Sequence, residues 1–376
     1  YIQETYERLV LKIFKFGGSS VKDAAAMMKV SKIILSHDKC RVVVLSATKN
    51  TTNDLEKIGK TSSMSEENLS TDLIQSLVQR HRSISHELEL DIELSLLEVE
   101  TELSLISKSM LGDGEVDPKK MDSLYSIGER LSSLILSKYL QRVSTKKVAY
   151  KDVREVLKTN DQWNLASPLI GETASEINLW GDIGESDLII TQGFIGSTAS
   201  GETTTLGREG SDFSATILGE VLNASEVVIW TDVAGVATCD PRIVKNAEFI
   251  ANLNYKHAAL LAHFGAKVLF ERTLEPAIRK KFPVYVKSTL SPVEIGTCIN
   301  DLPLHSGPVG LAIEDNFLTI VGERLLSSDV NLPFDEFTNY EVFKQTDDYI
   351  TIKVASEDIE NFVEKIHSWI LKSRHS

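Results

Sequence analysis

The N-terminal part of the chain alternates between apolar runs of strand length and segments with helical spacing. Residues 11–16 form a short apolar run that contains a lysine and ends at Gly17-Gly18. Apolar residues then recur at helical spacing from Val21 to Leu35, and a second strand-length run covers 41–46. Strand, glycine turn, helix and strand in this order predict a parallel β-sheet.

A long helical tract is predicted next, between about residues 68 and 110, with Glu and Ser on its solvated side. Its apolar positions, at mixed three- and four-residue spacings, are Leu73, Leu77, Ile84, Leu88, Leu94, Leu97 and Leu105. Gly112-Asp113-Gly114 and Pro118 interrupt the pattern, and a second helix is predicted over 121–140.

The rest of the chain predicts a doubly wound α/β domain followed by a small α+β unit. Further strand-length runs, separated by helical patterns that include 211–222, cover 147–150, 188–192, 226–230 and 283–286. Breaker residues over 302–308 are typical of a linker, so we predict two domains, 1–301 and 309–376. The second is expected to contain strands near 317–321 and 349–354 and a helix over 359–371.

Composition narrows the class of protein. The chain has 376 residues, of which 42% are hydrophobic and 25% charged, as in globular proteins, which excludes disorder of the whole chain. A formal net charge of −14 disfavours general binding to nucleic acid or anionic membranes. The scattered Cys40, Cys239 and Cys298 indicate a reducing compartment without a structural zinc site. No membrane span or signal peptide is recognisable, so we expect a cytoplasmic protein.

The first segment with candidate chemistry is Lys15-Phe16-Gly17-Gly18-Ser19-Ser20. Glycines between a strand and a helix let backbone N–H groups approach a phosphate, and the lysine can face the same anion. The alternative is a turn that needs glycine only for its geometry, because the spacing matches neither the P-loop nor the dinucleotide fingerprint.

The second segment is Thr203-Thr204-Thr205-Leu206-Gly207-Arg208-Glu209-Gly210-Ser211-Asp212, just before a predicted helix. Its arginine can form a bidentate pair with a carboxylate. The alternative is a capped loop in which Ser211 or Asp212 is the N-cap and Arg208 pairs with Glu209.

Two further segments carry isolated polar groups. In the stretch 230–242, Asp232 could accept hydrogen bonds from ribose hydroxyls and Arg242 could reach a phosphate, or the stretch could be an Asp-Pro turn without ligand. In 264–269, Lys267 could contact an anion or could be a surface lysine at a helix C-terminus.

Together and in this order, these segments resemble the aspartate kinases (aspartokinases) of the amino-acid kinase family. The matching stretches are 15–20 (KFGGSS), Ser46-Ala47 with Thr52-Asn53 and Leu55, Gly128-Glu129, Asp152-Val153-Arg154, 191–196 (TQGFIG), 203–212 (TTTLGREGSD), 231–242 and 264–269. The resemblance implies a three-layer αβα sandwich around a mainly parallel eight-stranded sheet. It also implies transfer of the γ-phosphoryl group of ATP to the side-chain carboxylate of L-aspartate, giving 4-phospho-L-aspartate for lysine, threonine and methionine biosynthesis.

The resemblance also implies roles for individual residues. Lys15 and Asp212 would be catalytic, with Lys15 on the transferred phosphoryl group and Asp212 organising that lysine. The substrate would be bound by Ser46, Thr52, Glu129 and Arg208. The nucleotide would be bound by Gly17, Gly18, Ser19, Thr231, Asp232, Arg242 and Lys267. Mg²⁺ is expected to accompany ATP, held by phosphate oxygens and water rather than by protein ligands.

The chain departs from the family pattern at several positions. The family usually has glycine where Asn50 and Glu209 stand, often tyrosine at Ala237, and His-Pro where this chain has Phe270-Glu271. From residue 309 onward there is room for about one ACT-like regulatory module, beginning with a strand over 310–321, which could support a homodimer. An enzyme acting on another small carboxylate and a catalytically silent binding paralogue therefore stay open as alternatives.

Overall fold

The computed structural model describes residues 10–181, 183, 187–265, 269, 271–304 and 306–375. By its internal contacts the chain divides into two compact units, one ending at Asp232 and one beginning at Val233. This division lies at a different place from the domain boundary predicted between residues 301 and 309, which stays a prediction.

Strands in the order β3-β4-β2-β1-β7 form the centre of the first unit. They are β1 (Lys12–Phe16), β2 (Cys40–Leu45), β3 (Lys147–Tyr150), β4 (Asp187–Gln192) and β7 (Glu226–Thr231). Every neighbouring pair is parallel. All six residues of β2 are buried, as the apolar run predicts for a strand covered on both faces. The strand predictions for this unit are confirmed.

Helices cover both faces of this sheet. They are α1 (Ala24–Leu35), α5 (Pro118–Val143) and α7 (Gly210–Val221), with the short helix η1 (Gly18–Val21) before α1. Because strand crossovers are right-handed, α1 and α5 lie on one face and α7 lies on the other. The helix α5 packs on β2, β3 and β4, whereas α7 packs on β1, β2 and β7.

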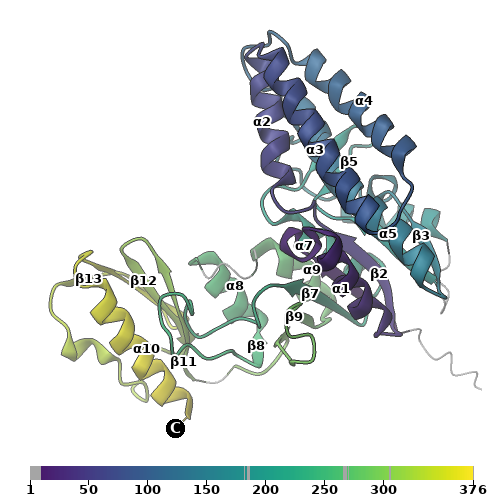
Figure 1. The fold of residues 1–376 in the computed structure, drawn as a ribbon. Helices are drawn as coiled ribbons and strands as arrows, with labels where there is room; N and C mark the ends of the chain where they lie inside the picture. Colours follow the sequence, from purple (N-terminus) through teal and green to yellow (C-terminus); the bar gives the residue numbers. More distant parts are fainter. Residues whose placement is uncertain are drawn as a thin grey trace, which may run out of the picture. The chain divides into compact units, whose positions relative to one another are not determined.

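A cluster of four helices extends beyond the sheet, as Figure 1 shows. It consists of α2 (Thr51–Ser63), α3 (Glu67–Glu87), α4 (Glu93–Ser109) and α5. The prediction of one helical tract over 68–110 is wrong, because the chain reverses between α3 and α4, where Glu89 adopts a left-handed conformation (φ 52°). The helix α2 was not predicted, since its buried face includes Thr, Gly and Ser residues.

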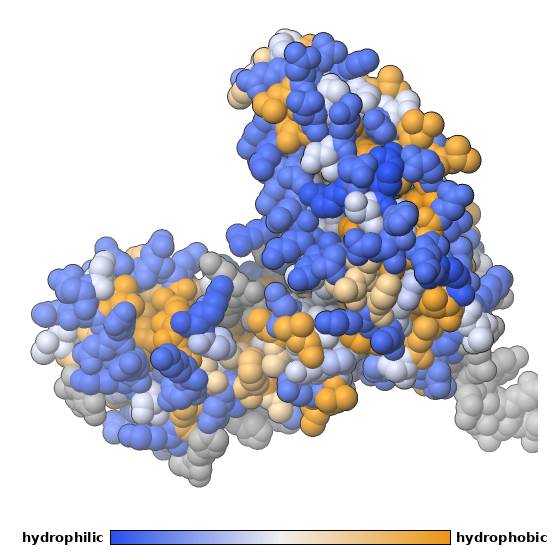
Figure 2. All heavy atoms as spheres, viewed as in Figure 1, coloured by the Kyte–Doolittle hydropathy of each residue, from blue (hydrophilic) through white to orange (hydrophobic). Residues whose placement is uncertain are grey.

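Three of the leucines assigned to the helical core are exposed instead. Leu94, Leu97 and Leu105 lie on the outer side of α4, and Figure 2 shows hydrophobic surface over this helix. Leu96, Val99 and Leu103 provide the buried side. The tract thus carries apolar residues on two sides, which spacing alone does not separate.

The remaining elements of the first unit are short. They are η2 (Val153–Glu155), α6 (Ile170–Glu176), η3 (Ile177–Trp180) and the antiparallel pair β5 (Ile195–Ser197) and β6 (Thr203–Thr205). The strand β6 begins the threonine-rich segment 203–212 that was predicted to carry chemistry, and this segment continues into the first turn of α7.

The strands of the second unit fall into two groups. The first has the order β9-β10-β8, where β10 is antiparallel to β9 and parallel to β8. Its elements are β8 (Asn252–Asn254), α8 (Tyr255–His263), η4 (Glu271–Leu274), α9 (Glu275–Lys280), β9 (Val284–Ser288) and β10 (Thr297–Asn300). The predicted strand over 283–286 is confirmed as part of β9.

The second sheet is antiparallel, in the order β11-β12-β14-β13, and forms a core with the C-terminal helix. Its elements are β11 (Gly307–Glu314), β12 (Phe317–Glu323), η5 (Pro333–Glu336), β13 (Tyr340–Gln345), β14 (Tyr349–Val354) and α10 (Ile359–His375). The predicted strands near 317–321 and 349–354 and the helix over 359–371 are confirmed. The single strand expected over 310–321 is wrong: the chain turns at Asp315 (φ 50°) and forms the hairpin β11–β12.

In the part of the chain that the structure describes, no helix is long and apolar enough to cross a membrane.

Candidate active site

The predicted motifs of the first unit meet at one edge of its parallel sheet. Parallel strands end at the same edge, so the loops after β1, β2, β4 and β7 lie side by side. Backbone hydrogen bonds join them: the Ser46 N–H donates to the Phe16 carbonyl (3.1 Å) and the Gly193 N–H to the Leu45 carbonyl (2.8 Å). The Gly17 N–H donates across to the Trp230 carbonyl (3.4 Å).

A buried ion pair lies at the centre of this edge. The Lys15 ammonium is 2.6 Å from Oδ1 of Asp212, and these residues are only 7% and 3% exposed. The lysine side chain lies over the glycine turn: a Cβ atom placed on Gly17 would be 3.6 Å from the Lys15 Nζ. Asp212 belongs to the first turn of α7, where the helix dipole favours a negative charge. The two residues predicted to be catalytic are therefore in direct contact.

Glu129 supplies a second buried carboxyl group. It lies on α5, is 3% exposed, and its Oε1 accepts a hydrogen bond from the Ala47 N–H (3.2 Å). Its Oε2 is buried and has no hydrogen-bond partner among the described residues. Burial raises the pKa of Glu129 to about 8, although the Ala47 hydrogen bond and the charge of Lys15 act in the opposite direction. A half-satisfied carboxyl group of this kind can accept a hydrogen bond from a cationic ligand.

Two glycines allow the segment 46–51 to approach the site closely. A Cβ atom on Gly18 would lie 2.7 Å from the Ala47 carbonyl oxygen. A Cβ atom on Gly128 would lie 2.9 Å from the Ala47 Cβ and 3.0 Å from the Thr51 Cγ2. Any larger side chain at either position would displace this segment, so both glycines are needed for packing at the site.

Asp122 is a buried carboxylate of the site that the sequence analysis missed. It lies on α5 about two helical turns before Glu129. Its oxygens accept hydrogen bonds from the Thr205 hydroxyl (2.6 Å), the Thr205 N–H (2.9 Å) and the Asn164 N–H (3.0 Å). Burial raises its pKa despite these bonds. Asp122 thus connects β6 and the loop containing Asn164 to the helix that carries Glu129. Its spacing of two helical turns from Glu129 was the sequence feature that could have identified it.

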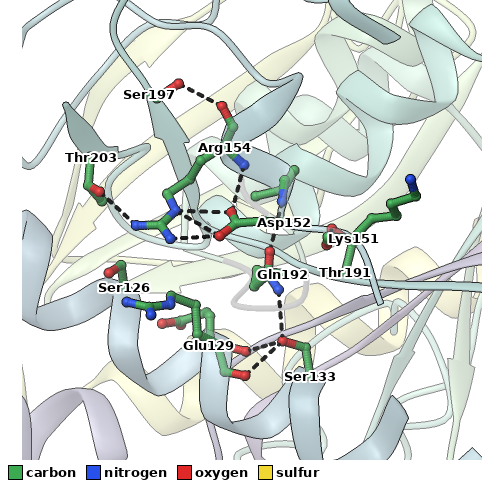
Figure 3. Close-up of polar contacts among 12 residues, drawn as sticks. Ser126, Glu129, Ser133, Lys151, Asp152, Arg154, Thr191, Gln192, Ser197 and Thr203 are labelled. Carbon is green, nitrogen blue, oxygen red and sulfur yellow. Dashed lines mark hydrogen bonds and ion pairs between the residues drawn. The ribbon is translucent and has the colours of Figure 1, made fainter. Parts of the chain in front are cut away.

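A polar network connects the threonine-rich segment to α5, as Figure 3 shows. The Arg154 guanidinium donates to both oxygens of Asp152 and to the Thr203 hydroxyl (2.9 Å). The Gln192 side chain accepts from the Val153 N–H (2.8 Å) and donates to the Ser133 hydroxyl (3.0 Å). Burial raises the pKa of Asp152, but the hydrogen bond and charge of Arg154 outweigh it, so this pKa lies below its usual value.

The network ends at the backbone of Glu129. The Ser133 hydroxyl donates to the Glu129 carbonyl oxygen (2.6 Å), as Figure 3 also shows. The residues 152–154, quoted only as a matching motif in the sequence, therefore orient the site without themselves belonging to the buried pair. Sequence reasoning missed Gln192 and Ser133, because their partners lie far away along the chain.

Asn50 and Glu209, the two positions at which the family resemblance leads us to expect glycine, both adopt a left-handed backbone. Asn50 has φ 70° and precedes α2, and Glu209 has φ 57° and precedes α7. Asparagine tolerates this conformation, whereas a glutamate there is strained. Loss of hydration and the charge of Asp212 raise the pKa of Glu209, while the charges of Lys15 and Arg208 lower it. Glu209 thus adds a carboxylate to a region with two cations.

The other predicted site residues are placed as follows. Ser46 and Thr52 are half-buried, after β2 and in the first turn of α2, and Arg208 is exposed beside Glu209. Ser19 lies in η1, and the Thr231 hydroxyl donates to Asp232 (3.2 Å) at the end of β7.

The last two predicted nucleotide ligands are Arg242 and Lys267. Arg242 belongs to the second unit, where its guanidinium pairs with Asp240 (2.6 Å). Lys267 and Phe270 lie outside the described residues. Their roles stay predictions.

Within the described ranges, no three His, Cys, Asp or Glu side chains come together in a way that could hold a metal ion.

Residues 11–288 match the model of the amino acid kinase family. The chain belongs to the amino acid kinase family. Among curated relatives of this family, it is 39% identical over 295 residues to lysine-sensitive aspartokinase 3 of Escherichia coli, covering 76% of this chain and 63% of that relative. It is 34% identical over 323 residues to the aspartokinase of Chlamydia trachomatis, covering 81% of this chain and 68% of that one. The chain thus spans under two thirds of the E. coli relative.

Solved structures of the family agree. The E. coli aspartokinase III in complex with aspartate and ADP matches with a TM-score of 0.82 and 28% identity, over 96% of this chain and 100% of that one. The same enzyme in complex with lysine and aspartate matches with a TM-score of 0.80 and 27% identity, over 96% and 99% of the two chains. The amino-acid kinase fold predicted from the sequence is confirmed.

Proposed function

We propose that this member of the amino acid kinase family is an aspartokinase. It would transfer the γ-phosphoryl group of ATP to the side-chain carboxylate of L-aspartate, giving 4-phospho-L-aspartate and ADP, the first step toward lysine, threonine and methionine. The similarity to relatives named aspartokinase supports this proposal. The observation that carries it is the buried Lys15–Asp212 pair beside the half-satisfied carboxyl group of Glu129.

The proposed reaction needs cations rather than a general base. An aspartate side chain has a pKa of about 3.9, so the attacking carboxylate is already ionised at pH 7. The main barrier is repulsion between this anion and the anionic phosphate, which fixed positive charges reduce. Lys15 supplies such a charge, and the 2.6 Å contact with Asp212 holds its ammonium at the sheet edge. Asp212 is therefore a residue that positions Lys15, and no proton transfer to it is required.

The amino-acid substrate carries one positive and two negative groups, and the site offers partners for each. The unpartnered Oε2 of Glu129 would accept a hydrogen bond from the α-ammonium group. Arg208 would pair with a carboxylate, in the bidentate geometry that suits a guanidinium. Ser46 and Thr52, both half-buried near Glu129's helix, would contribute hydroxyl groups. Binding an ammonium group explains why an anion-binding site contains a buried acid.

The nucleotide would lie over the glycine turn that follows β1. Gly18 and Ser19 would offer backbone N–H groups to its phosphates, next to the Lys15 ammonium. Gly17, whose N–H is bonded to the Trp230 carbonyl, would let the phosphates approach the turn closely. Thr231 and Asp232, at the end of β7, would contact the nucleoside. Mg²⁺, held by phosphate oxygens and water, would neutralise part of the phosphate charge. Arg242 and Lys267 stay predicted phosphate ligands.

The test is aspartate-dependent turnover of ATP with Mg²⁺, in which hydroxylamine traps the acyl phosphate as a hydroxamate. We expect hydroxamate formation, and we expect Lys15→Ala to abolish it. The matched control is Lys12→Ala on the same strand, which removes a partly exposed pair with Glu226 (2.9 Å) and should leave turnover intact. Wild-type protein that binds ATP but forms no hydroxamate would exclude aspartate as the substrate and favour a silent binding paralogue.

A second candidate acceptor, another small carboxylate, is favoured by Glu209. Its negative charge is coupled to Arg208, the residue proposed to bind a carboxylate of aspartate. Comparing kcat/KM for aspartate with that for monocarboxylate analogues would separate the two candidates. A preference for an acceptor other than aspartate would establish the second.

We also propose that the predicted C-terminal domain, residues 309–376, is a shortened ACT-like module that supports a homodimer. The four-stranded antiparallel sheet with one packed helix is compatible with such a module. Light scattering on the purified chain would give the oligomeric state.

A further inference from the structure

A buried histidine that none of the proposed steps uses holds the segment 46–51. His81 lies on α3 and is fully buried. Its Nε2 is 3.0 Å from the Thr48 hydroxyl, and its Nδ1 is 2.8 Å from the Leu77 carbonyl oxygen. The Thr48 hydroxyl is in turn 2.6 Å from the Thr51 hydroxyl, which accepts a hydrogen bond from Arg80 (2.9 Å).

The donor and acceptor of every hydrogen bond in this network follow from the two groups at its ends, the Leu77 carbonyl and the Arg80 guanidinium. A carbonyl oxygen only accepts, so Nδ1 of His81 carries the proton. Burial lowers the pKa of His81 to about 4, so the ring is neutral and its Nε2 accepts from Thr48. Arg80 only donates, so Thr51 accepts from Arg80. Thr48 gives its single hydroxyl proton to His81, so in the Thr48–Thr51 bond Thr51 must be the donor. The hydroxyl groups of Thr48 and Thr51 then each accept one hydrogen bond and donate one.

Charged groups that face this network come from α2 and α3. Arg80 pairs with Asp54 (2.7 Å), and both exert weaker opposing effects on the pKa of His81. Burial dominates, so the ring stays neutral at physiological pH.

The segment that His81 holds also touches the proposed active site. The Ala47 N–H donates to Glu129, and Ala47 packs against both Gly18 and Gly128. Thr48, the next residue, is fixed by the histidine. A displacement of Thr48 would therefore move the amide that orients the Glu129 carboxyl group.

We propose that His81 is a positioning residue for the amino-acid substrate: through Thr48 it holds the segment 46–51 so that the Ala47 N–H orients Glu129. The inference rests on the proposed function in one respect, since Glu129 is taken as the partner of the substrate ammonium. It assigns His81 no contact with substrate or nucleotide.

The first test compares two substitutions of Thr48. Thr48→Val keeps the shape but removes the donor to His81, and we expect KM for aspartate to rise roughly tenfold, with KM for ATP unchanged. Thr48→Ser keeps the hydroxyl group and should restore aspartate affinity. The matched control is Ser107→Ala, which removes a buried hydroxyl bonded to Ser62 (2.7 Å) in the same helical cluster but remote from the segment.

An equal rise in both KM values for Thr48→Val, or the same rise in KM for aspartate in Ser107→Ala, would overturn the inference. Each would mean that the hydrogen bond only stabilises the fold.

The second test needs no turnover. Nitrogen-15 spectra of His81 should show a neutral ring protonated at Nδ1 at pH 6; a ring protonated at Nε2, or one that titrates near 6.5, would overturn the inference. Carbon-13 spectra should show that Thr48→Val raises the pKa of Glu129, because a looser Ala47 N–H stabilises the carboxylate less. An unchanged Glu129 titration would also overturn it. If wild-type protein forms no hydroxamate, the proposed function fails, and these spectra still decide the role of His81.

Discussion

The raised pKa of Glu129 predicts how the affinity for aspartate depends on pH. With a pKa of about 8, the carboxyl group keeps its proton at pH 7 in the unliganded protein. An α-ammonium group binds well only to the ionised form, so binding must remove this proton. The ionised fraction is about one in eleven at pH 7 and about one in a hundred at pH 6. The apparent dissociation constant for aspartate should therefore rise about ninefold between pH 7 and pH 6 and level off above about pH 9.

Calorimetry in buffers of different ionisation enthalpy would measure this coupling directly. We expect release of nearly one proton per bound aspartate at pH 7 and of far fewer at pH 9. The control is Glu129→Gln, which keeps the side-chain shape but should bind aspartate weakly and without proton release. Aspartate affinity that is constant between pH 6 and pH 8, with no proton release, would refute the assignment of Glu129.

The same carboxyl group should lower the stability of the unliganded fold at high pH. The unfolded chain loses this proton near 4.5 and the folded chain only near 8, so between these values the folded state binds more protons. The free energy of unfolding must then fall as pH rises through this window, by at most about 5 kcal/mol. Glu129→Gln should remove this slope and be the more stable protein at pH 8. Urea unfolding of both proteins at pH 5 and pH 8 would test the sign.

Three further predictions follow from the surroundings of the site. Glu209→Gly should relieve the left-handed strain and raise the free energy of unfolding by about 1 kcal/mol in urea titrations, while lowering KM for aspartate; unchanged values of both would contradict it. Gly128→Ala should displace Ala47 and cost 10²-fold or so in kcat/KM, whereas Gly171→Ala, in open space on a helix, should have no effect. Asp122→Asn should lower thermal stability and turnover together, because one acceptor oxygen is lost against buried donors of β6, at a cost of roughly 1–3 kcal/mol; normal stability would show that β6 is held by other contacts.

Much of the fold could be predicted because its signals are local. The strands of the parallel sheet are continuous apolar runs such as 41–46, and glycines mark the turns that follow them. The break between α3 and α4 could not be predicted, since Glu89 has no intrinsic preference for a left-handed turn. Leu94, Leu97 and Leu105 were misplaced because helical spacing does not state which apolar side faces the core.

The sequence by itself determined the chemical inventory of the site: Lys15 at a strand end, Asp212 at a helix start, and Glu129 and Arg208 in motifs of a known family. Only the tertiary structure decided what these groups do to one another. The 2.6 Å contact of Lys15 with Asp212, the raised pKa of Glu129 and the neutral ring of His81 all depend on burial by residues distant in the chain. Electrostatic energies depend on the separation of charges in space and on their exclusion from water, and neither quantity is written in the order of the residues.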